Sequence, residues 1–401
     1  MPPISRFVLC LIASVPACFA ASQSMVIDAG RHDRSATPAF VDLSLPVGQS
    51  AQHYSFFTEG RLMPAQVEPL DDGRSRLWWL VSDLQAGQSL QGEIRMQETA
   101  SPEQADMFAW KDSSTGPEKS RDLLLGDRPI LRYIHTPFDP QDIENTKKPY
   151  HHVFDPTGQR LITKGPGGIF PHHRGIYFGY NKCRVGDEVY DTWHAIKGEH
   201  QNHIAIIHEF AGPVFGGHVV RIHWNDREGK PFIEETRRVL AFRQPAGQVL
   251  MEFSSTLQAV DKPVFLSGDR QHSGVQFRAA QAVAENKTAT RYLRPERWAS
   301  LPADKEHNAP DFIDLPWNAL QYPLDGQTYT VAYLSDPANP EPAEFSERLY
   351  GRFGEYFPWQ LDRDHPLSVR YRWWITADSV NREQVERLYQ DLADPPSILL
   401  K

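Results

Sequence analysis

Histidine, arginine and acidic side chains are concentrated in the stretch Phe170–His203. An imidazole can bind a metal or exchange a proton near neutral pH, and a guanidinium can hold a carboxylate or a developing oxyanion. We therefore interpret this stretch as a polar site carried on loops and strand ends. Its candidate catalytic residues are His172, His173, Arg174, His194, Glu199 and His200.

The stretch begins with the motif His172-His173-Arg174-Gly175. Adjacent residues of a strand point to opposite faces, so both histidines reach one site only where the backbone turns. The glycine-rich Gly165–Gly168 just before the motif indicates such a turn. One histidine would act as the general acid or base, and Arg174 would hold a substrate carboxylate or an oxyanion. In the alternative, one histidine packs in the core and Arg174 forms a structural ion pair.

His194, Glu199 and His200 could bind a divalent metal, because three protein ligands and an open position form the usual catalytic zinc site. Their spacing matches no established zinc motif, and the chain has no His-Glu-x-x-His sequence. Ile204–Ile207 favours a strand, on which His200 and His203 would point to opposite faces. No metal is therefore assigned. A divalent metal at these three residues is one interpretation, and a metal-free polar site is the other.

A third polar group lies at Ser267–Arg278, where Asp269 is close to His272 in the sequence. A carboxylate beside a histidine can orient it as a base, although a charged hairpin rim would have the same composition. Trp193 would stack on a ring of the substrate, and Arg348 would close the cleft over it. The candidate substrate-binding residues are Trp193, His152, Asp269, Arg270, His272, Arg348 and Tyr350.

The sequence around these residues is rich in strand signals. The 401 residues include 32 prolines and 26 glycines, more than a helical protein would carry. Apolar and polar residues alternate with period two at Phe40–Leu45 and at His218–Trp224, as in half-buried strands. One helix is expected near the C-terminus, capped by Asp378 or Ser379.

These patterns predict a mainly β protein with two domains. Residues 22–115 would form a small β-sandwich that supports the rest, and residues 123–395 a large antiparallel β-sandwich that carries the site. The polar stretch 100–122 would be a linker or a long excursion between them.

The first 20 residues have the features of a signal peptide, with Arg6 before an apolar stretch and a small-residue cleavage site ending at Ala20. We therefore expect a periplasmic or secreted protein. Lipoprotein processing at Cys18 is the alternative, although Pro16 fits a lipobox poorly. No other apolar run in the sequence is long enough to span a bilayer. The net charge of −9 argues against nucleic acid as a partner.

Two segments resemble a bacterial family of unknown function whose members are often labelled methane oxygenase PmoA-like. The run Gly167–Trp193 contains PHHRGIYFGYNK and leads into DTWH, and Ser335–Phe353 reads SDPANPEPAEFSERLYGRF. The resemblance spans roughly residues 125–380 and leaves out the N-terminal sandwich. The chain departs from the family pattern at Gly268–His272, where members more often carry a Lys-Glu-Gly type of stretch.

The resemblance implies a role in bacterial sugar catabolism and a sandwich similar to that of galactose-mutarotase-like proteins. A membrane subunit of methane monooxygenase needs several apolar spans, which this sequence lacks. Our leading hypothesis is a carbohydrate-active hydrolase or lyase acting on a sugar or oligosaccharide. The alternatives are a non-catalytic carbohydrate-binding protein and a metal-dependent oxygenase-like enzyme. Nucleotide and serine-hydrolase chemistry lack support, because the chain has neither a P-loop nor a G-x-S-x-G elbow.

Overall fold

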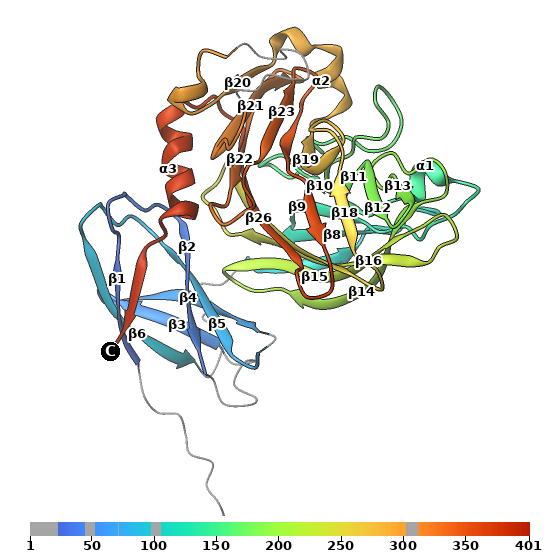
Figure 1. The fold of residues 1–401 in the computed structure, drawn as a ribbon. Helices are drawn as coiled ribbons and strands as arrows, with labels where there is room; N and C mark the ends of the chain where they lie inside the picture. Colours follow the sequence, from blue (N-terminus) through green and yellow to red (C-terminus); the bar gives the residue numbers. More distant parts are fainter. Residues whose placement is uncertain (1–22, 45–52, 71, 98–105, 302–311) are drawn as a thin grey trace, which may run out of the picture.

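The computed structural model describes residues 23–44, 53–70, 72–97, 106–301 and 312–401. Strands make up 54% of the structure and helices 8%, so the predicted mainly β fold is confirmed. The large sheets are antiparallel and pack as sandwiches (Figure 1). Within the described residues, no helix is both long and apolar enough to cross a membrane. The expected signal peptide lies outside the described residues.

The N-terminal part of the chain forms a seven-stranded sheet, here called the N-terminal sheet, which has a core of its own. In spatial order its strands are β2 (Thr37–Leu43), β5 (Ser75–Val81), β4 (Arg61–Pro69), β3 (His53–Thr58), β6 (Ser89–Gln97), β1 (Gln23–Asp28) and β27 (Ser397–Leu400). Met25, Ile27 and Phe56 are buried in its core. The last strand comes from the C-terminus, where Leu400 pairs with Met25, so the end of the chain returns to its beginning (Figure 1).

Two eight-stranded sheets supply most of the largest core. The first, here called the β11 sheet, has the order β23 (Glu344–Arg348), β24 (Arg352–Tyr356), β19 (Ser273–Arg278), β11 (Ile176–Tyr180), β10 (Tyr150–Val153), β9 (Arg128–Ile134), β8 (Ser120–Leu125) and β7 (Phe108–Asp112). The second, the β16 sheet, has the order β14 (His200–Phe210), β15 (Phe215–Asn225), β16 (Pro231–Phe242), β17 (Gln248–Ala259), β26 (Leu367–Thr376), β22 (Gln327–Ser335), β21 (Trp317–Leu324) and β20 (Arg291–Leu293). Phe178 of the first meets Phe253 of the second, with ring centroids 6.4 Å apart.

A smaller sheet adds to the same core. It contains β13 (Glu188–Tyr190), β12 (Lys182–Val185), β18 (Val264–Ser267) and β25 (Trp359–Leu361). Strand β12 directly follows β11, and β18 precedes β19, so this sheet continues two strands of the β11 sheet. Cys183 and Leu266 are buried in the shared core.

The helices are short, apart from one. They are α1 (Ile143–Thr146), α2 (Gln281–Glu285), α3 (Arg382–Ala393) and the 3₁₀ turns Lys287–Ala289 and Glu296–Trp298. The cap of α3 is Asn381, later in the chain than the predicted Asp378 or Ser379. The Asn381 side chain accepts a hydrogen bond from the backbone N–H of Gln384, and the Gln384 side chain accepts one from the Asn381 N–H. This reciprocal capping box satisfies two backbone donors and so fixes the start of the helix.

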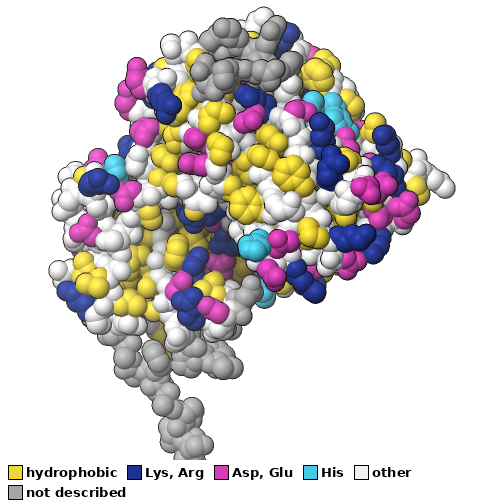
Figure 2. Space-filling view, in the orientation of Figure 1, with side chains coloured by type: hydrophobic (Ala, Val, Ile, Leu, Met, Phe, Trp, Pro, Cys, Tyr) yellow, Lys and Arg dark blue, Asp and Glu magenta, His cyan; other side chains and the backbone are white. Residues whose placement is uncertain are grey.

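The N-terminal sheet is attached to the sandwich through Trp78. Neighbouring residues of a strand point to opposite faces, so Trp79 lies in the N-terminal core while Trp78 packs on Phe215 of the β16 sheet, with ring centroids 6.0 Å apart. Trp78 Nε1 donates to Glu68 at 2.7 Å, and Arg238 donates to the same carboxylate at 2.7 Å. Figure 2 shows charged side chains in the hollow between these two parts. Trp79 therefore belongs to the core of the N-terminal sheet, and Trp78 to its interface with the sandwich.

The polar stretch 100–122 is not a simple linker. It contains all of β7, which pairs with β8 through Phe108 and Leu125. Phe108 is buried, whereas Lys111 and Asp112 are exposed. The stretch is polar because β7 is an edge strand, one side of which faces solvent. Polar residues on an edge strand also disfavour pairing with a strand of another molecule.

Candidate functional site

Four loops bring candidate residues together beside the β11 sheet. His172 and His173 lie in the loop between β10 and β11, and His194 lies between β13 and β14. His272 immediately precedes β19, and Tyr350 is in the turn between β23 and β24. Because β11, β19 and β24 are neighbours in one sheet, the loops that connect them meet over it.

The face of the sheet beneath these loops is polar. Along β11, β19 and β24 the phenylalanines are buried in the sandwich core, so the residues next to them point to the opposite face. These residues are Tyr177, Gln276, Arg278 and Arg352. Arg352 donates to Gln276 Oε1 at 2.6 Å, and the Arg278 guanidinium lies 5.0 Å from the centroid of the Tyr350 ring.

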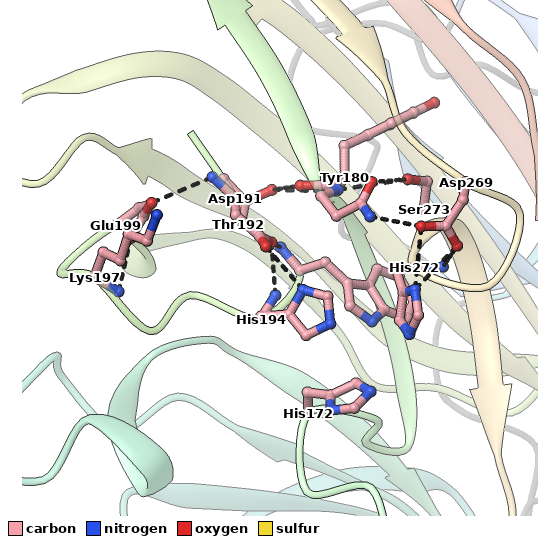
Figure 3. Close-up of polar contacts among 12 residues, drawn as sticks. His172, Tyr180, Asp191, Thr192, His194, Lys197, Glu199, Asp269, His272 and Ser273 are labelled. Atoms are coloured by element: carbon pink, nitrogen blue, oxygen red, sulfur yellow. Dashed lines mark hydrogen bonds and ion pairs between the residues drawn. The ribbon is translucent and has the colours of Figure 1, made fainter. Parts of the chain in front are cut away.

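Four imidazoles form a cluster over this face. The ring centroids of His172 and His194 are 4.7 Å apart, and those of His194 and His272 are 4.8 Å apart. The rings of His173 and His272 are nearly parallel, with centroids 5.6 Å apart. Figure 3 shows His172 approaching from one loop while His194 and His272 approach from two others. Among the described residues, His172, His173 and His272 are the group whose ligand atoms all lie within 4.8 Å of one another.

Two of these histidines are oriented by aspartates three residues before them. His194 Nδ1 lies 2.8 Å from Asp191 Oδ2, and His272 Nδ1 lies 2.9 Å from Asp269 Oδ1 (Figure 3). Each aspartate also accepts backbone N–H groups of the same turn, so the local Asp-x-x-His segment holds itself in place. Since an ionised carboxylate only accepts hydrogen bonds, Nδ1 of each ring carries a proton, so Nε2 is the nitrogen that has the lone pair in the neutral tautomer.

His172 and His173 have neutral rings. Burial lowers the pKa of His172 to about 2, with further contributions from the nearby His194 and Lys148. Burial also holds the pKa of His173 well below its ordinary value, and Arg352 adds to this effect. Neutral imidazoles can bind a metal or accept a hydrogen bond, but at neutral pH they do not serve as cationic acids.

A buried lysine ties two of the loops together. Lys148 Nζ donates to the carbonyl oxygens of Trp193 and His172, and it lies 4.0 Å from the centroid of the Tyr177 ring. Burial lowers the pKa of Lys148 well below its ordinary value, and the neighbouring Arg174 lowers it further. Lys148 therefore fixes the spacing between the His172 loop and the His194 loop.

Several polar atoms around the cluster are buried and have no hydrogen-bond partner among the described residues. They are His172 Nε2, His173 Nδ1, Trp193 Nε1, the Nε and Nη1 atoms of Arg174 and the Nε and Nη2 atoms of Arg278. Buried polar atoms are nearly always paired with protein, water or a ligand. The concentration of unpaired atoms at one place indicates a site that binds something.

The structure separates the three residues predicted as metal ligands. Glu199 is buried and accepts hydrogen bonds from the backbone N–H groups of Asp191 and Lys197 (Figure 3). These bonds fix the backbone of the loop that carries His194. His200 stacks on Phe138 with ring centroids 3.7 Å apart, its Nδ1 donates to the Gly198 carbonyl, and its Nε2 accepts from Asn225. His194, Glu199 and His200 therefore form no common ligand set. Long-range packing unites His172, His173 and His272 instead.

Other predicted residues also lie away from the open part of the site. Trp193 is 1% exposed and is covered by Tyr177 and His173, so it forms the wall of the site and offers no face to a sugar. Arg174 is buried and donates to Glu144 at 2.9 Å. Arg348 is buried at the end of β23, where it donates to the Glu347 carbonyl.

The remaining predicted residues have structural partners. His152 Nδ1 lies 2.9 Å from Thr163 Oγ1, and burial lowers the pKa of His152 to about 3. Arg270 forms an ion pair with Glu344 at 2.7 Å. Tyr350, in contrast, lies at the cluster: its ring centroid is 4.6 Å from that of Phe170.

Sequence reasoning missed Asp191, Lys148, Arg278 and Arg352. The Asp-x-x-His spacing could have identified Asp191, because Asp269 and His272 share it. The alternation Val275-Gln276-Phe277-Arg278 could have placed Gln276 and Arg278 on one face. Lys148 had no signal, because its role depends on two loops that are distant in the sequence.

The fold and the site define a mainly β protein of the antiparallel sandwich class, with a histidine-rich site on one outer sheet face. The chain belongs to the family of unknown function DUF6807, whose family model matches residues 120–390. The match begins at the first residue of β8, includes all the residues of the histidine cluster, and leaves out β1 to β7. The expected membership of a family of unknown function is therefore confirmed. No curated protein matches the chain.

Proposed function

We propose that this protein is a carbohydrate-active enzyme, a hydrolase or lyase that acts on a sugar or oligosaccharide by proton transfer. The observation that carries the proposal is the meeting of two Asp–His pairs, 191/194 and 269/272, next to unpaired arginine donors and an aromatic rim. Perturbed and oriented titratable groups in one cleft are characteristic of catalytic sites.

In this proposal His194 transfers the proton. Its Nδ1–H is held by Asp191, so its Nε2 can accept a proton, and Asp191 then stabilises the imidazolium that forms. In hydrolysis the proton comes from water, whose oxygen bonds to the anomeric carbon as the glycosidic C–O bond breaks. In elimination the proton comes from a sugar carbon, a C=C bond forms and the C–O bond breaks. In both reactions the leaving oxygen takes up a proton from water or from the His194 imidazolium, and His194 returns to its neutral form.

We assign to Arg278 the anion-binding role that the sequence suggested for Arg174, because Arg278 lies beside the Tyr350 ring, whereas Arg174 is already paired with the Glu144 carboxylate. Its Nε and Nη2 atoms are buried and lack an acceptor among the described residues. Burial also lowers the pKa of Arg278 to about 10, which leaves it cationic at neutral pH. A guanidinium with unused donors suits a substrate carboxylate or a developing negative oxygen, so the proposal favours acidic sugars.

Phe170 and Tyr350 would bind the sugar ring in place of Trp193. Their rings are tilted by 36° and have centroids 4.6 Å apart, and Phe170 is 41% exposed. The Tyr350 ring also lies 6.2 Å from His173, so the aromatic pair borders the histidine cluster. Aromatic rings beside a polar site are suited to stacking on a sugar.

The proposal includes export to the periplasm or beyond. It rests on the sequence of the first 20 residues, with Arg6 before the apolar stretch and Ala20 at the expected cleavage site. The bacterial sugar catabolism implied by the family resemblance fits this location.

The test is a screen of neutral and acidic oligosaccharides with the wild-type protein, followed by His194→Gln and Asp191→Asn. We expect His194→Gln to lower kcat by about 10²- to 10⁴-fold, the usual contribution of a general acid or base. His365→Ala is the matched control, because His365 pairs with Asp362 at 3.0 Å in the same Asp-x-x-His arrangement but on the exposed surface. A lyase yields an ultraviolet-absorbing C=C bond, whereas a hydrolase yields only a new reducing end.

Unchanged turnover in His194→Gln would overturn the assignment of the base. Tight sugar binding without turnover would instead favour a carbohydrate-binding protein, for which the arginine and aromatic groups suffice.

A further inference from the structure

The ring nitrogens of three histidines approach one another without protein partners. His172 and His173 come from one loop and His272 from another, and one nitrogen of each lies within 4.8 Å of the other two. His172 Nε2 and His173 Nδ1 are buried and unpaired among the described residues. His173 is only 2% exposed, so bulk water does not satisfy its nitrogen. His272 already donates Nδ1–H to Asp269, which leaves Nε2 as its available ligand atom.

We propose that His172, His173 and His272 bind a divalent first-row transition metal ion such as zinc(II). Three neutral imidazoles are a suitable ligand set for zinc, copper, iron or nickel, and three ligands with an open position form the catalytic pattern. Metal-binding histidines almost always donate their other N–H to a carboxylate or carbonyl, as His272 does to Asp269.

The geometry requires only a small adjustment. Zinc–nitrogen bonds of about 2.0–2.1 Å in a tetrahedral arrangement put the ligand nitrogens roughly 3.4 Å apart. The ligand atoms lie at most 4.8 Å apart, so each pair would have to approach by no more than about 1.4 Å. The fourth position would face His194, whose ring centroid is 4.7 Å from that of His172 and 4.8 Å from that of His272. His194 would thus be next to whatever molecule occupies the open position.

A second histidine group shows what a structural cluster looks like in this protein. His151 Nε2 and His218 Nε2 are 2.9 Å apart and hydrogen bond to each other, and His203 Nδ1 bonds to the Tyr133 hydroxyl at 3.1 Å. Trp110 stacks on His218. This second group also has two buried nitrogens without a partner among the described residues, His151 Nδ1 and His135 Nε2. The difference is convergence: within the described part of the chain, His172, His173 and His272 are the group that brings three ligand atoms within 4.8 Å of one another, and this favours a ligand-binding role for them.

The metal proposal does not depend on the proposed carbohydrate activity, because its readout is metal content. Protein without a histidine tag is stripped with a chelator, dialysed against zinc(II) and analysed for bound metal. We expect about one equivalent in the wild type and in the matched control His365→Ala, and less than about a tenth of that in His172→Ala and His272→Ala. Cobalt(II) in place of zinc is expected to give the intense visible absorption of tetrahedral coordination.

Two further variants keep the result interpretable. His272→Gln retains a polar side chain if His272→Ala fails to fold, and it is expected to lose the metal in the same way. His194→Gln is expected to retain the metal, even though it would lower kcat by about 10²- to 10⁴-fold under the proposed function. A wild-type protein that takes up no zinc at micromolar free metal, or equal uptake in the His172 and His272 variants, would overturn the proposal. Bound metal without sugar turnover would leave it intact and reject only the carbohydrate activity.

Discussion

The imidazole of His173 lies nearly parallel to that of His272, at an interplanar angle of 16°, although the two residues are far apart in the sequence. The first ring is buried and neutral, and the second is held by Asp269. This relationship joins the His-His-Arg-Gly loop to the loop before β19. The candidate site is therefore built by two loops that are distant in the sequence, and His272 belongs to it through this contact.

Replacing Asp269 with asparagine is expected to weaken zinc binding by about 10- to 100-fold without removing a ligand. The carboxylate fixes Nδ1 as the donor nitrogen and increases the basicity of Nε2, whereas an amide does this less well. The dissociation constant can be measured by competition with a chromophoric chelator. Asp362→Asn removes the equivalent surface carboxylate and should leave the affinity unchanged. Equal affinities in Asp269→Asn and the wild type would show that His272 needs no orienting partner.

Replacing Phe170 or Tyr350 with alanine is expected to raise KM for a sugar substrate by about tenfold with a smaller effect on kcat. An aromatic stacking contact contributes on the order of 1 kcal/mol to binding, and it forms equally in the ground and transition states. Steady-state kinetics on the substrate found by the screen would measure the change. Phe265→Ala is the control, because Phe265 is an exposed phenylalanine on β18. A loss confined to kcat would contradict a stacking role.

Replacing Gly175 with alanine is expected to destabilise the protein by about 3 kcal/mol. Gly175 has φ +25°, and a Cβ there would lie 2.1 Å from the His151 carbonyl oxygen. The Gly175 N–H donates to the Lys164 carbonyl oxygen, and the Gly175 carbonyl accepts a hydrogen bond from the backbone N–H of Arg278. Gly175 therefore joins the loop that carries His172 and His173 to β19. Denaturant unfolding would measure the loss.

Gly186 provides the comparison. It has φ +59° with open space where the Cβ would be, so alanine there should cost only about 1 kcal/mol. Similar losses at the two positions would show that crowding at Gly175 is relieved by local movement.

Replacing Glu355 with glutamine should remove a pH dependence of stability. Burial raises the pKa of Glu355 from 4.5 to about 7, so the folded protein keeps this carboxyl protonated while the unfolded chain ionises it. The free energy of unfolding of the wild type should therefore fall between about pH 4.5 and pH 7, by about 3 kcal/mol. Glutamine keeps the oxygen that accepts hydrogen bonds from Ser335 and Asn339, and it does not ionise. The free energy of unfolding of Glu355→Gln, relative to that of the wild type, should therefore increase across this pH range.

The comparison requires denaturant unfolding at several pH values. The contribution of Asp42 to stability should depend on pH in the opposite direction, as Asp42→Asn would show. Hydrogen bonds from Arg76 lower the pKa of Asp42, so the stabilisation that the ionised carboxylate provides is lost as the pH falls. If the difference in free energy of unfolding between the wild type and Glu355→Gln stayed constant from pH 4.5 to pH 7, the raised pKa of Glu355 would be contradicted.

The sequence by itself determined the secondary structure class and part of the site. Period-two alternation identified strands such as His218–Trp224, because a half-buried strand exposes every second residue to water. The glycine-rich Gly165–Gly168 indicated the turn that lets two adjacent histidines reach one place, and Gly167 and Gly168 do have positive φ.

Only the tertiary structure decided which histidines meet. Local spacing grouped His194 with Glu199 and His200, but His200 begins β14 and turns toward Phe138. His272 joined the cluster because β19 pairs with β11, and strand order in a sheet is set by the packing of the whole core rather than by neighbouring residues. The burial of Trp193 and the pairing of β27 with β1 likewise depend on packing between distant parts of the chain. Alternation is a local property that a sequence displays, whereas contacts between distant strands depend on the collective burial of apolar faces.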